Sequence, residues 1–124
     1  MFEIGVVEEF AAAHAIRDYN GPCERIHGHN YRVEVTVAGH ETDQRGIVVD
    51  FRELRAMVRA VTDQLDHRFL NDLPAFDNTS PTSETLARYI YGQLSEPVKT
   101  HGLQLRRVTV WETQRAWASY SEDA

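Results

Sequence analysis

Two hydrophobic periods divide this chain, and their order constrains the fold more than any other feature. Apolar residues alternate with other residues over residues 2–10, as in a β-strand with one buried face. The β-branched residues Val33, Val35, Thr36 and Val37 favour a second strand over residues 27–38. Alternation returns over residues 105–113, and residues 116–120 can pair with that segment in a hairpin. Between these segments, two stretches have apolar residues at steps of three and four, as in amphipathic helices. The order strand, strand, helix, helix, strand, strand predicts an α+β fold.

Both predicted helices have recognisable starts. Asp50 offers a side-chain acceptor at the N-cap of the first helix, and Thr82 or Ser83 can cap the second. Residues 71–81 interrupt the helical pattern and predict a loop between the two helices. Pro97 separates the second helix from the strand that follows.

Strands in hairpins with the helices between them predict an antiparallel ββααββ sheet that carries both helices on one face. Because no repeat or linker interrupts the sequence, we expect a single domain over residues 1–124. The hydrophobic pattern supplies no layer for the second face of the sheet. We therefore expect a homo-oligomer in which the sheets of several subunits pair or pack.

Charge and composition argue against two classes of partner. The chain has 13 Lys and Arg against 19 Asp and Glu, so its formal net charge is -6. Binding to a phosphate backbone needs a basic face, and we therefore expect no nucleic-acid partner. The sequence has neither the apolar run of a membrane span nor the pattern of a signal peptide. We expect a cytoplasmic protein without a membrane partner.

The clearest chemical signal is the sequence His27-Gly28-His29. Residues at i and i+2 of a strand project from the same face, about 6–7 Å apart, so both imidazoles can reach one metal ion. His14 can supply a third imidazole if the first two strands form a hairpin. Three neutral histidines leave zinc an open coordination position, as in catalytic sites. The alternative is a chance pair in a chain with six histidines.

Cys23 is the only cysteine and cannot form an internal disulfide. It can be a buried small residue, a fourth ligand that closes a structural metal site, or a reactive thiol beside the metal. The polar neighbours Glu24 and Arg25 argue against the buried alternative and leave the other two.

Two further sets of ionisable residues have both a structural and a chemical interpretation. Asp66 and His67 end the first helix, where His67 can act as a C-terminal cap or, oriented by Asp66, as a catalytic group. Glu112 continues the apolar face of its strand, so it lies either at the solvent edge or in a site. A carboxylate in a site can accept two parallel N–H bonds from an amidine-like heterocycle edge.

The motifs together resemble a known family. The matching segments, in chain order, are Phe10-x-Ala12-Ala13-His14, Cys23-x3-His27-Gly28-His29, Leu65-Asp66-His67-x2-Leu70-Asn71, Pro81-Thr82-Ser83-Glu84 and Glu112-Thr113. They cover almost the whole chain and resemble the 6-pyruvoyl-tetrahydropterin synthase family. The spacing of three residues between Cys23 and His27 resembles the branch that makes 6-carboxy-5,6,7,8-tetrahydropterin.

The resemblance implies a tunnelling fold (T-fold), in which the sheets of several subunits form a barrel. It implies a hexamer of two stacked trimers with active sites between subunits, and zinc held by His14, His27 and His29. The implied substrate is 7,8-dihydroneopterin triphosphate. The implied products are 6-carboxy-5,6,7,8-tetrahydropterin, acetaldehyde and triphosphate, in queuosine or 7-deazapurine biosynthesis.

The resemblance also implies roles for the remaining candidate residues. The general base would be Cys23, and the proton relay would be completed by Asp66 and His67. The substrate contacts would be Glu112, which anchors the pterin, together with Thr82 and Ser83. Two alternatives remain: a 6-pyruvoyl-tetrahydropterin synthase, which eliminates triphosphate without cleaving the side chain, and a non-catalytic zinc- or pterin-binding module.

Overall fold

The computed structural model of the chain describes residues 1–18, 21 and 25–122. Its strands and α-helices are β1 (Phe2–His14), β2 (His27–Gly39), α1 (Phe51–Leu65), β3 (Arg68–Phe69), α2 (Ser83–Thr100), β4 (Gln104–Trp111) and β5 (Trp117–Tyr120). Two single-turn 3-10 helices, η2 (Leu70–Asp72) and η3 (Pro74–Phe76), lie between β3 and α2. Among the described residues, no helix is both long and apolar enough to span a membrane.

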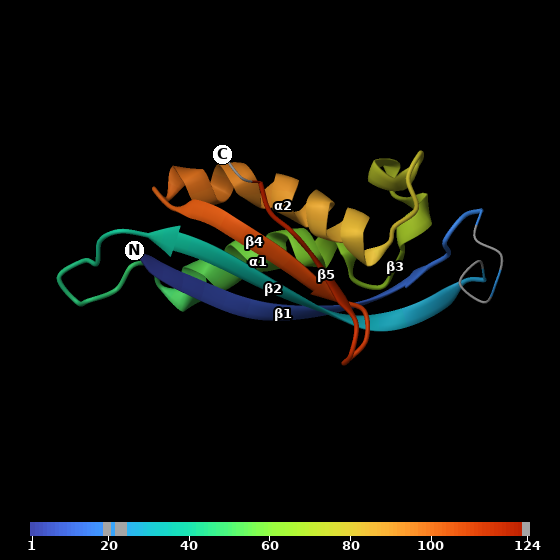
Figure 1. The fold of residues 1–124 in the computed structure, drawn as a ribbon, viewed down its shortest axis with the longest axis horizontal. Coiled ribbons are helices and arrows are strands. Elements are labelled where there is room, and N and C mark those ends of the chain that lie inside the picture. Colours follow the sequence, from blue (N-terminus) through green and yellow to red (C-terminus); the bar gives the residue numbers. More distant parts are fainter. Residues whose placement is uncertain (19–20, 22–24, 123–124) are drawn as a thin grey trace.

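The strands form one sheet in the order β3-β1-β2-β4-β5. β1 and β2 form a long antiparallel hairpin, which runs from the pair Phe2 and Gly39 to the pair His14 and His27. Both helices cover the same face of this sheet, and the described chain places no layer on the other face (Figure 1). The predicted α+β architecture is confirmed.

Two features of the sheet differ from the prediction. β1 extends to His14, beyond the predicted end at residue 10, because residues 11–14 continue the ladder with β2. This pairing overrides the weak strand propensity of the three alanines at positions 11–13. Between the end of α1 and the predicted loop over residues 71–81, the structure has an unpredicted strand, β3, which pairs with β1 in parallel and makes the sheet mixed. Two residues are too few to produce a detectable period.

α2 also differs from its prediction, because it continues through Pro97 to Thr100. A proline inside a helix removes the hydrogen bond to the carbonyl four residues earlier, here that of Gln93. Both Gln93 and Pro97 are exposed, so water can satisfy this carbonyl, whereas Val98 is buried and anchors the last turn. The helix is closed by Gly102, whose N–H donates to the Lys99 carbonyl at 2.9 Å.

The core fills the layer between the sheet and the two helices. Its fully buried side chains include Val33, Val35, Val37, Leu54, Val58, Leu65, Leu86, Ile90, Leu94, Val108 and Val110. Glu8 enters the same layer from β1, with a side chain that is only 10% exposed. It is paired with Nε of Arg55 at 3.0 Å and Nε of Arg59 at 3.2 Å, both from α1. A carboxylate on the inner face of β1 therefore ties this strand to α1.

The glycines at positions 92 and 102 allow a backbone test of the fold. A Cβ added at either position meets no atom within 4 Å, but Gly102 has a φ of +73° whereas Gly92 is helical. We expect Gly92→Ala to raise the free energy of unfolding by about 0.5–1 kcal/mol, because alanine favours the helix. We expect Gly102→Ala to lower it by about 1 kcal/mol, because a Cβ disfavours the left-handed conformation. Urea denaturation measures both, and equal effects would contradict the assignment of α2.

Candidate metal centre

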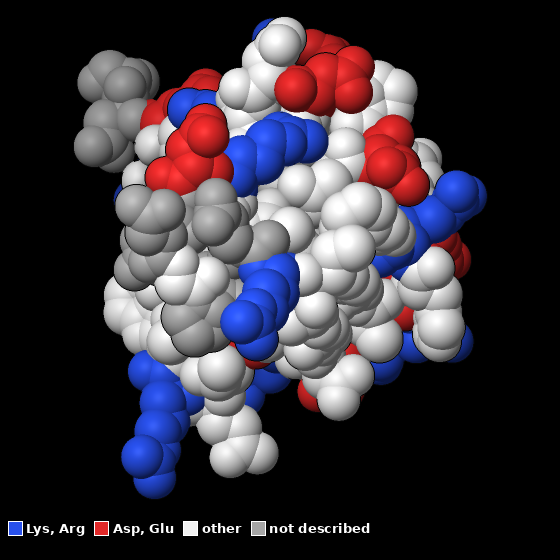
Figure 2. Space-filling view, turned by 90° about the vertical axis from the view of Figure 1, so that its right-hand side faces the viewer, with Lys and Arg blue, Asp and Glu red and all other residues white. Residues whose placement is uncertain are grey.

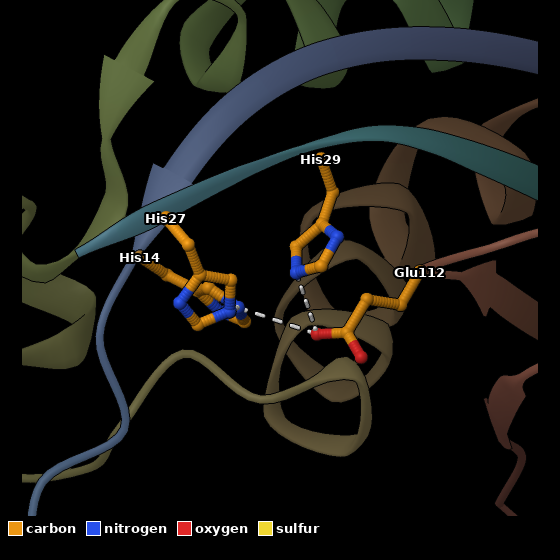
Figure 3. Close-up of side chains that lie close together, drawn as sticks. All are labelled: His14, His27, His29 and Glu112. Carbon is orange, nitrogen blue, oxygen red and sulfur yellow. Dashed lines mark hydrogen bonds and ion pairs between the residues drawn. The ribbon is translucent and has the colours of Figure 1, made fainter. Parts of the chain in front are cut away.

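Four side chains converge at one end of the sheet (Figure 3). The register of the β1–β2 hairpin pairs His14 with His27 and places His29 two ladder pairs away, on the same face. Glu112 follows β4 and lies on the helix-facing side, in phase with Val110. The neighbouring strands therefore bring together residues that are distant in the sequence.

The ligand atoms of this cluster lie within 4.8 Å of one another. Nε2 of His14 lies 2.9 Å from Nε2 of His27. One carboxylate oxygen of Glu112 lies 3.3 Å from Nε2 of His14 and 3.3 Å from Nε2 of His29. Three imidazole nitrogens and one carboxylate oxygen, all possible metal ligands, thus surround a common point.

Backbone carbonyls fix the tautomers of two of these histidines. Nδ1 of His14 lies 2.7 Å from the Pro81 carbonyl, and Nδ1 of His27 lies 2.7 Å from the Arg25 carbonyl. Because a carbonyl oxygen only accepts, each Nδ1 carries the proton and donates it. The Nε2 atoms of both rings then carry lone pairs that point into the cluster, as in metal-binding histidines.

These residues fit a divalent metal ion. Nε2 of His29 is buried and has no hydrogen-bond partner among the described residues. Burial lowers the pKa of His29, and the neighbouring His14 and His27 lower it further, against the opposing effect of Glu112. The neutral imidazole is the form that binds metals. A cation between the rings would satisfy His29 and remove the repulsion between the facing lone pairs of His14 and His27.

Tyr31 contacts two histidines of the cluster, His14 and His29, and the sequence motifs did not identify it as a site residue. Its side chain is fully buried, and its hydroxyl lies 3.2 Å from Nδ1 of His14. Burial raises the pKa of Tyr31, as does the nearby Glu112 carboxylate, so the phenol stays neutral. The available signal was its position two residues after His29, which places both side chains on one strand face.

Asp66 and His67 form a separate pair at the other edge of β1. One oxygen of Asp66 accepts from the Ala11 N–H at 2.9 Å, and the other lies 2.9 Å from Nδ1 of His67. These two hydrogen bonds lower the pKa of Asp66, and the bond from the Ala11 N–H has the larger effect. His67 has a φ of +59° and is 82% exposed. An open groove of about 490 Å³ is lined by both His29 and His67, but His67 is not brought into the histidine cluster.

The other predicted site residues have different surroundings. Thr82 is the N-cap of α2, and its hydroxyl accepts from the Thr85 N–H at 3.2 Å, whereas Ser83 is the first helical residue and half-buried. The contact between His14 and the carbonyl of Pro81 puts this motif next to the cluster. Cys23 lies outside the described residues.

Charged side chains of both signs occur at the end of the molecule that carries the loop after β1. Figure 2 looks onto this end and shows blue Lys and Arg side chains near its centre, with red Asp and Glu side chains mostly toward the upper side. The acidic net charge of the chain therefore does not exclude cationic groups from this end.

The helix-backed sheet and the converging imidazoles define a T-fold protein with a candidate metal centre. The chain belongs to the 6-pyruvoyl tetrahydropterin synthase family, whose model matches residues 3–123. It is 37% identical to a putative 6-carboxy-5,6,7,8-tetrahydropterin synthase of Archaeoglobus fulgidus, over 93% of this chain and 91% of the relative. It is 36% identical to a dihydroneopterin monophosphate aldolase of Pyrococcus furiosus, over 83% and 82%.

A solved structure supports the same assignment. The 6-pyruvoyl tetrahydropterin synthase of Caenorhabditis elegans superimposes with a TM-score of 0.88 at 29% identity, covering 98% of this chain and 96% of that chain. These relatives carry the names of three different reactions, so membership of the family identifies a pterin-processing enzyme and leaves its reaction to be proposed.

Proposed function

We propose that the protein is a zinc-dependent carbon–carbon lyase. It would convert 7,8-dihydroneopterin triphosphate and water to 6-carboxy-5,6,7,8-tetrahydropterin, acetaldehyde and triphosphate, as a step of queuosine or 7-deazapurine biosynthesis. The observation that carries the proposal is the convergence of three imidazole Nε2 atoms, one of them buried without a hydrogen-bond partner. The similarity to relatives named for 6-carboxy-5,6,7,8-tetrahydropterin synthesis supports the choice of product.

The metal would be zinc, held by His14, His27 and His29. When bound, zinc supplies a Lewis acid that polarises substrate oxygens. The two carbonyl bonds to Nδ1 support this assignment, because they leave Nε2 of His14 and His27 free to bind the ion. The neutral state favoured at His29 supports it further.

The proton transfers would be carried out by the side chains of the chain itself. Cys23 would take a proton from the side chain of the pterin as general base. His67 would relay protons, and the 2.9 Å contact from Asp66 would hold its ring in position. This contact supports a paired role, since a carboxylate that binds Nδ1 orients the imidazole and selects its tautomer.

Substrate binding would depend on Glu112, with Thr82 and Ser83 nearby. Glu112 can accept two N–H bonds from the pyrimidine edge of the pterin. Its carboxylate lies 3.3 Å from two imidazoles, so a pterin bound to it would lie beside the metal ligands. Basic side chains at this end of the molecule (Figure 2) would attract the triphosphate.

The active sites would lie between subunits of a homo-oligomer, in a hexamer of two stacked trimers. Two observations support shared sites. His67 is exposed at the edge of β1 that pairs with β3 and is not one of the residues that converge in the cluster of its own chain, so the relay of a site could come from a second subunit. The uncovered face of the sheet (Figure 1) offers a surface for assembly.

Incubation with 7,8-dihydroneopterin triphosphate, followed by mass analysis of the products, tests the proposed reaction. We expect 6-carboxy-5,6,7,8-tetrahydropterin and acetaldehyde, and loss of both when a chelator removes the metal. A 6-pyruvoyl product without acetaldehyde would support the elimination reaction instead. The monophosphate of the same pterin is the matched second substrate, and faster turnover of it would favour the aldolase activity for which one relative is named.

A further inference from the structure

Tyr31 contacts the histidine cluster through both its hydroxyl and its ring. The hydroxyl oxygen lies 3.2 Å from Nδ1 of His14, whereas the other ring nitrogen, Nε2, faces His27 in the cluster. Both side chains are fully buried, so water does not compete for this contact. Nδ1 of His14 thus has two partners, the Pro81 carbonyl at 2.7 Å and the Tyr31 hydroxyl at 3.2 Å.

The direction of these hydrogen bonds follows from the chemistry of the partners. The Pro81 carbonyl can only accept, so Nδ1 carries the proton and the Tyr31 hydroxyl is a second acceptor for it. A shared N–H is a bifurcated bond, of which the tyrosine provides the weaker branch. Both branches favour the tautomer of His14 whose Nε2 lone pair points into the cluster.

The ring of Tyr31 restrains the imidazoles by packing. It stacks on Phe10, with ring centroids 4.9 Å apart and planes at 16°. Its other contacts are edge-to-face, with His14 at 5.9 Å and His29 at 5.4 Å. Since Tyr31 is held between Phe10 and two imidazoles, neither imidazole can rotate without disturbing a packed aromatic group.

We propose that Tyr31 is a positioning residue that fixes the orientation of His14 and His29 and so sets the affinity and geometry of the metal site. This inference rests on the proposed function, because it assumes that the cluster holds a metal ion. Hydrogen-bonding partners behind a ligating histidine typically change metal affinity by about 10–100-fold when they are removed. Because one branch of the bond to His14 remains in place at Pro81, we expect the lower end of this range.

The test compares two tyrosine-to-phenylalanine variants of the full chain. Tyr31→Phe removes the hydroxyl beneath the cluster and keeps the ring. Tyr91→Phe is the matched control, because its hydroxyl is also bound inside the protein, to the Leu105 carbonyl at 3.1 Å, but lies outside the cluster. The measurements are zinc affinity, by competition with a chromophoric chelator, the visible absorption spectrum of the Co²⁺-loaded protein, and thermal stability.

We expect Tyr31→Phe to bind zinc about tenfold more weakly and to change the Co²⁺ spectrum, and Tyr91→Phe to leave both unchanged. If the role of Tyr31 were purely structural, both variants would lose thermal stability, and neither would change in zinc affinity or in the Co²⁺ spectrum. Equal zinc affinity and equal spectra for Tyr31→Phe and the wild type would overturn the inference alone. A wild type that binds no zinc would overturn the metal centre and the inference together. A wild type that binds zinc but makes a different product would overturn the proposed reaction only.

Discussion

Replacing His29 with alanine should abolish tight zinc binding and lower turnover by about 1000-fold, with little loss of stability. The loss of turnover corresponds to the several kcal/mol by which a metal ion stabilises developing charge. The small effect on stability follows from the surroundings of this residue. Nε2 of His29 has no hydrogen-bond partner among the described residues, so its removal breaks no hydrogen bond. Its 3.3 Å contact with Glu112 is an ion pair only when the ring is protonated, and the pKa of His29 is lowered by burial.

The comparison with His14→Ala makes this prediction sharper. His14 is fully buried and bonds to the Pro81 carbonyl and the Tyr31 hydroxyl, so its loss should also cost about 1–3 kcal/mol of folding free energy. His40→Ala, at an exposed position outside the cluster, is the control for histidine removal. Metal analysis, turnover and urea denaturation separate these outcomes. Full activity of His29→Ala after treatment with a chelator would exclude the metal centre.

The second large effect is expected for Cys23→Ala, which should keep its zinc and lose turnover by at least about 100-fold. A general base typically contributes 100- to 10000-fold, and the three proposed ligands are unchanged in this variant. Metal content and product formation are measured on the same preparation. Loss of zinc would instead make Cys23 a closing ligand, and undiminished turnover would remove its role as base.

Mixing two inactive variants tests whether the sites are shared between subunits. Cys23→Ala and His67→Ala each lack one group of the proposed relay. If one site takes Cys23 from one subunit and His67 from another, random mixed oligomers contain about one quarter intact sites. Recovery of that fraction of activity after refolding the mixture would support shared sites. No recovery in mixed oligomers would place both groups in the same chain.

Much of the fold could be predicted because the hydrophobic period of the sequence agrees with the observed strand pairing over long segments. Alternation in the first segment and β-branched residues in the second predicted a hairpin, and β1 and β2 form it. The cap at Asp50 was predicted as well, and its side chain accepts from the Arg52 N–H at 2.8 Å. The same hairpin brings His14 to His27, as the pairing of the two strands required.

The remaining features depend on tertiary contacts that have no local pattern. β3 consists of two residues that are held by pairing with β1. The end of α2 depends on the burial of Val98, which outweighs the loss of one helical hydrogen bond at Pro97. The partners of His14 could not be predicted from sequence either. Pro81 contributes through its backbone carbonyl, a group that every residue possesses, and only the three-dimensional path of the chain shows which carbonyl is used.

The positions of the three histidines in the chain also have a consequence for the order in which the site is completed during synthesis. All three imidazoles, together with Phe10 and Tyr31, belong to the first hairpin, whereas Pro81 and Glu112 emerge from the ribosome much later. Contacts between neighbouring segments form before those between distant ones. All three imidazoles are therefore synthesised before the segments that form the two helices, whose packing completes the site. The carbonyl that fixes His14 is added only when α2 docks, so a metal ion captured early would be released more readily than one held by the finished subunit.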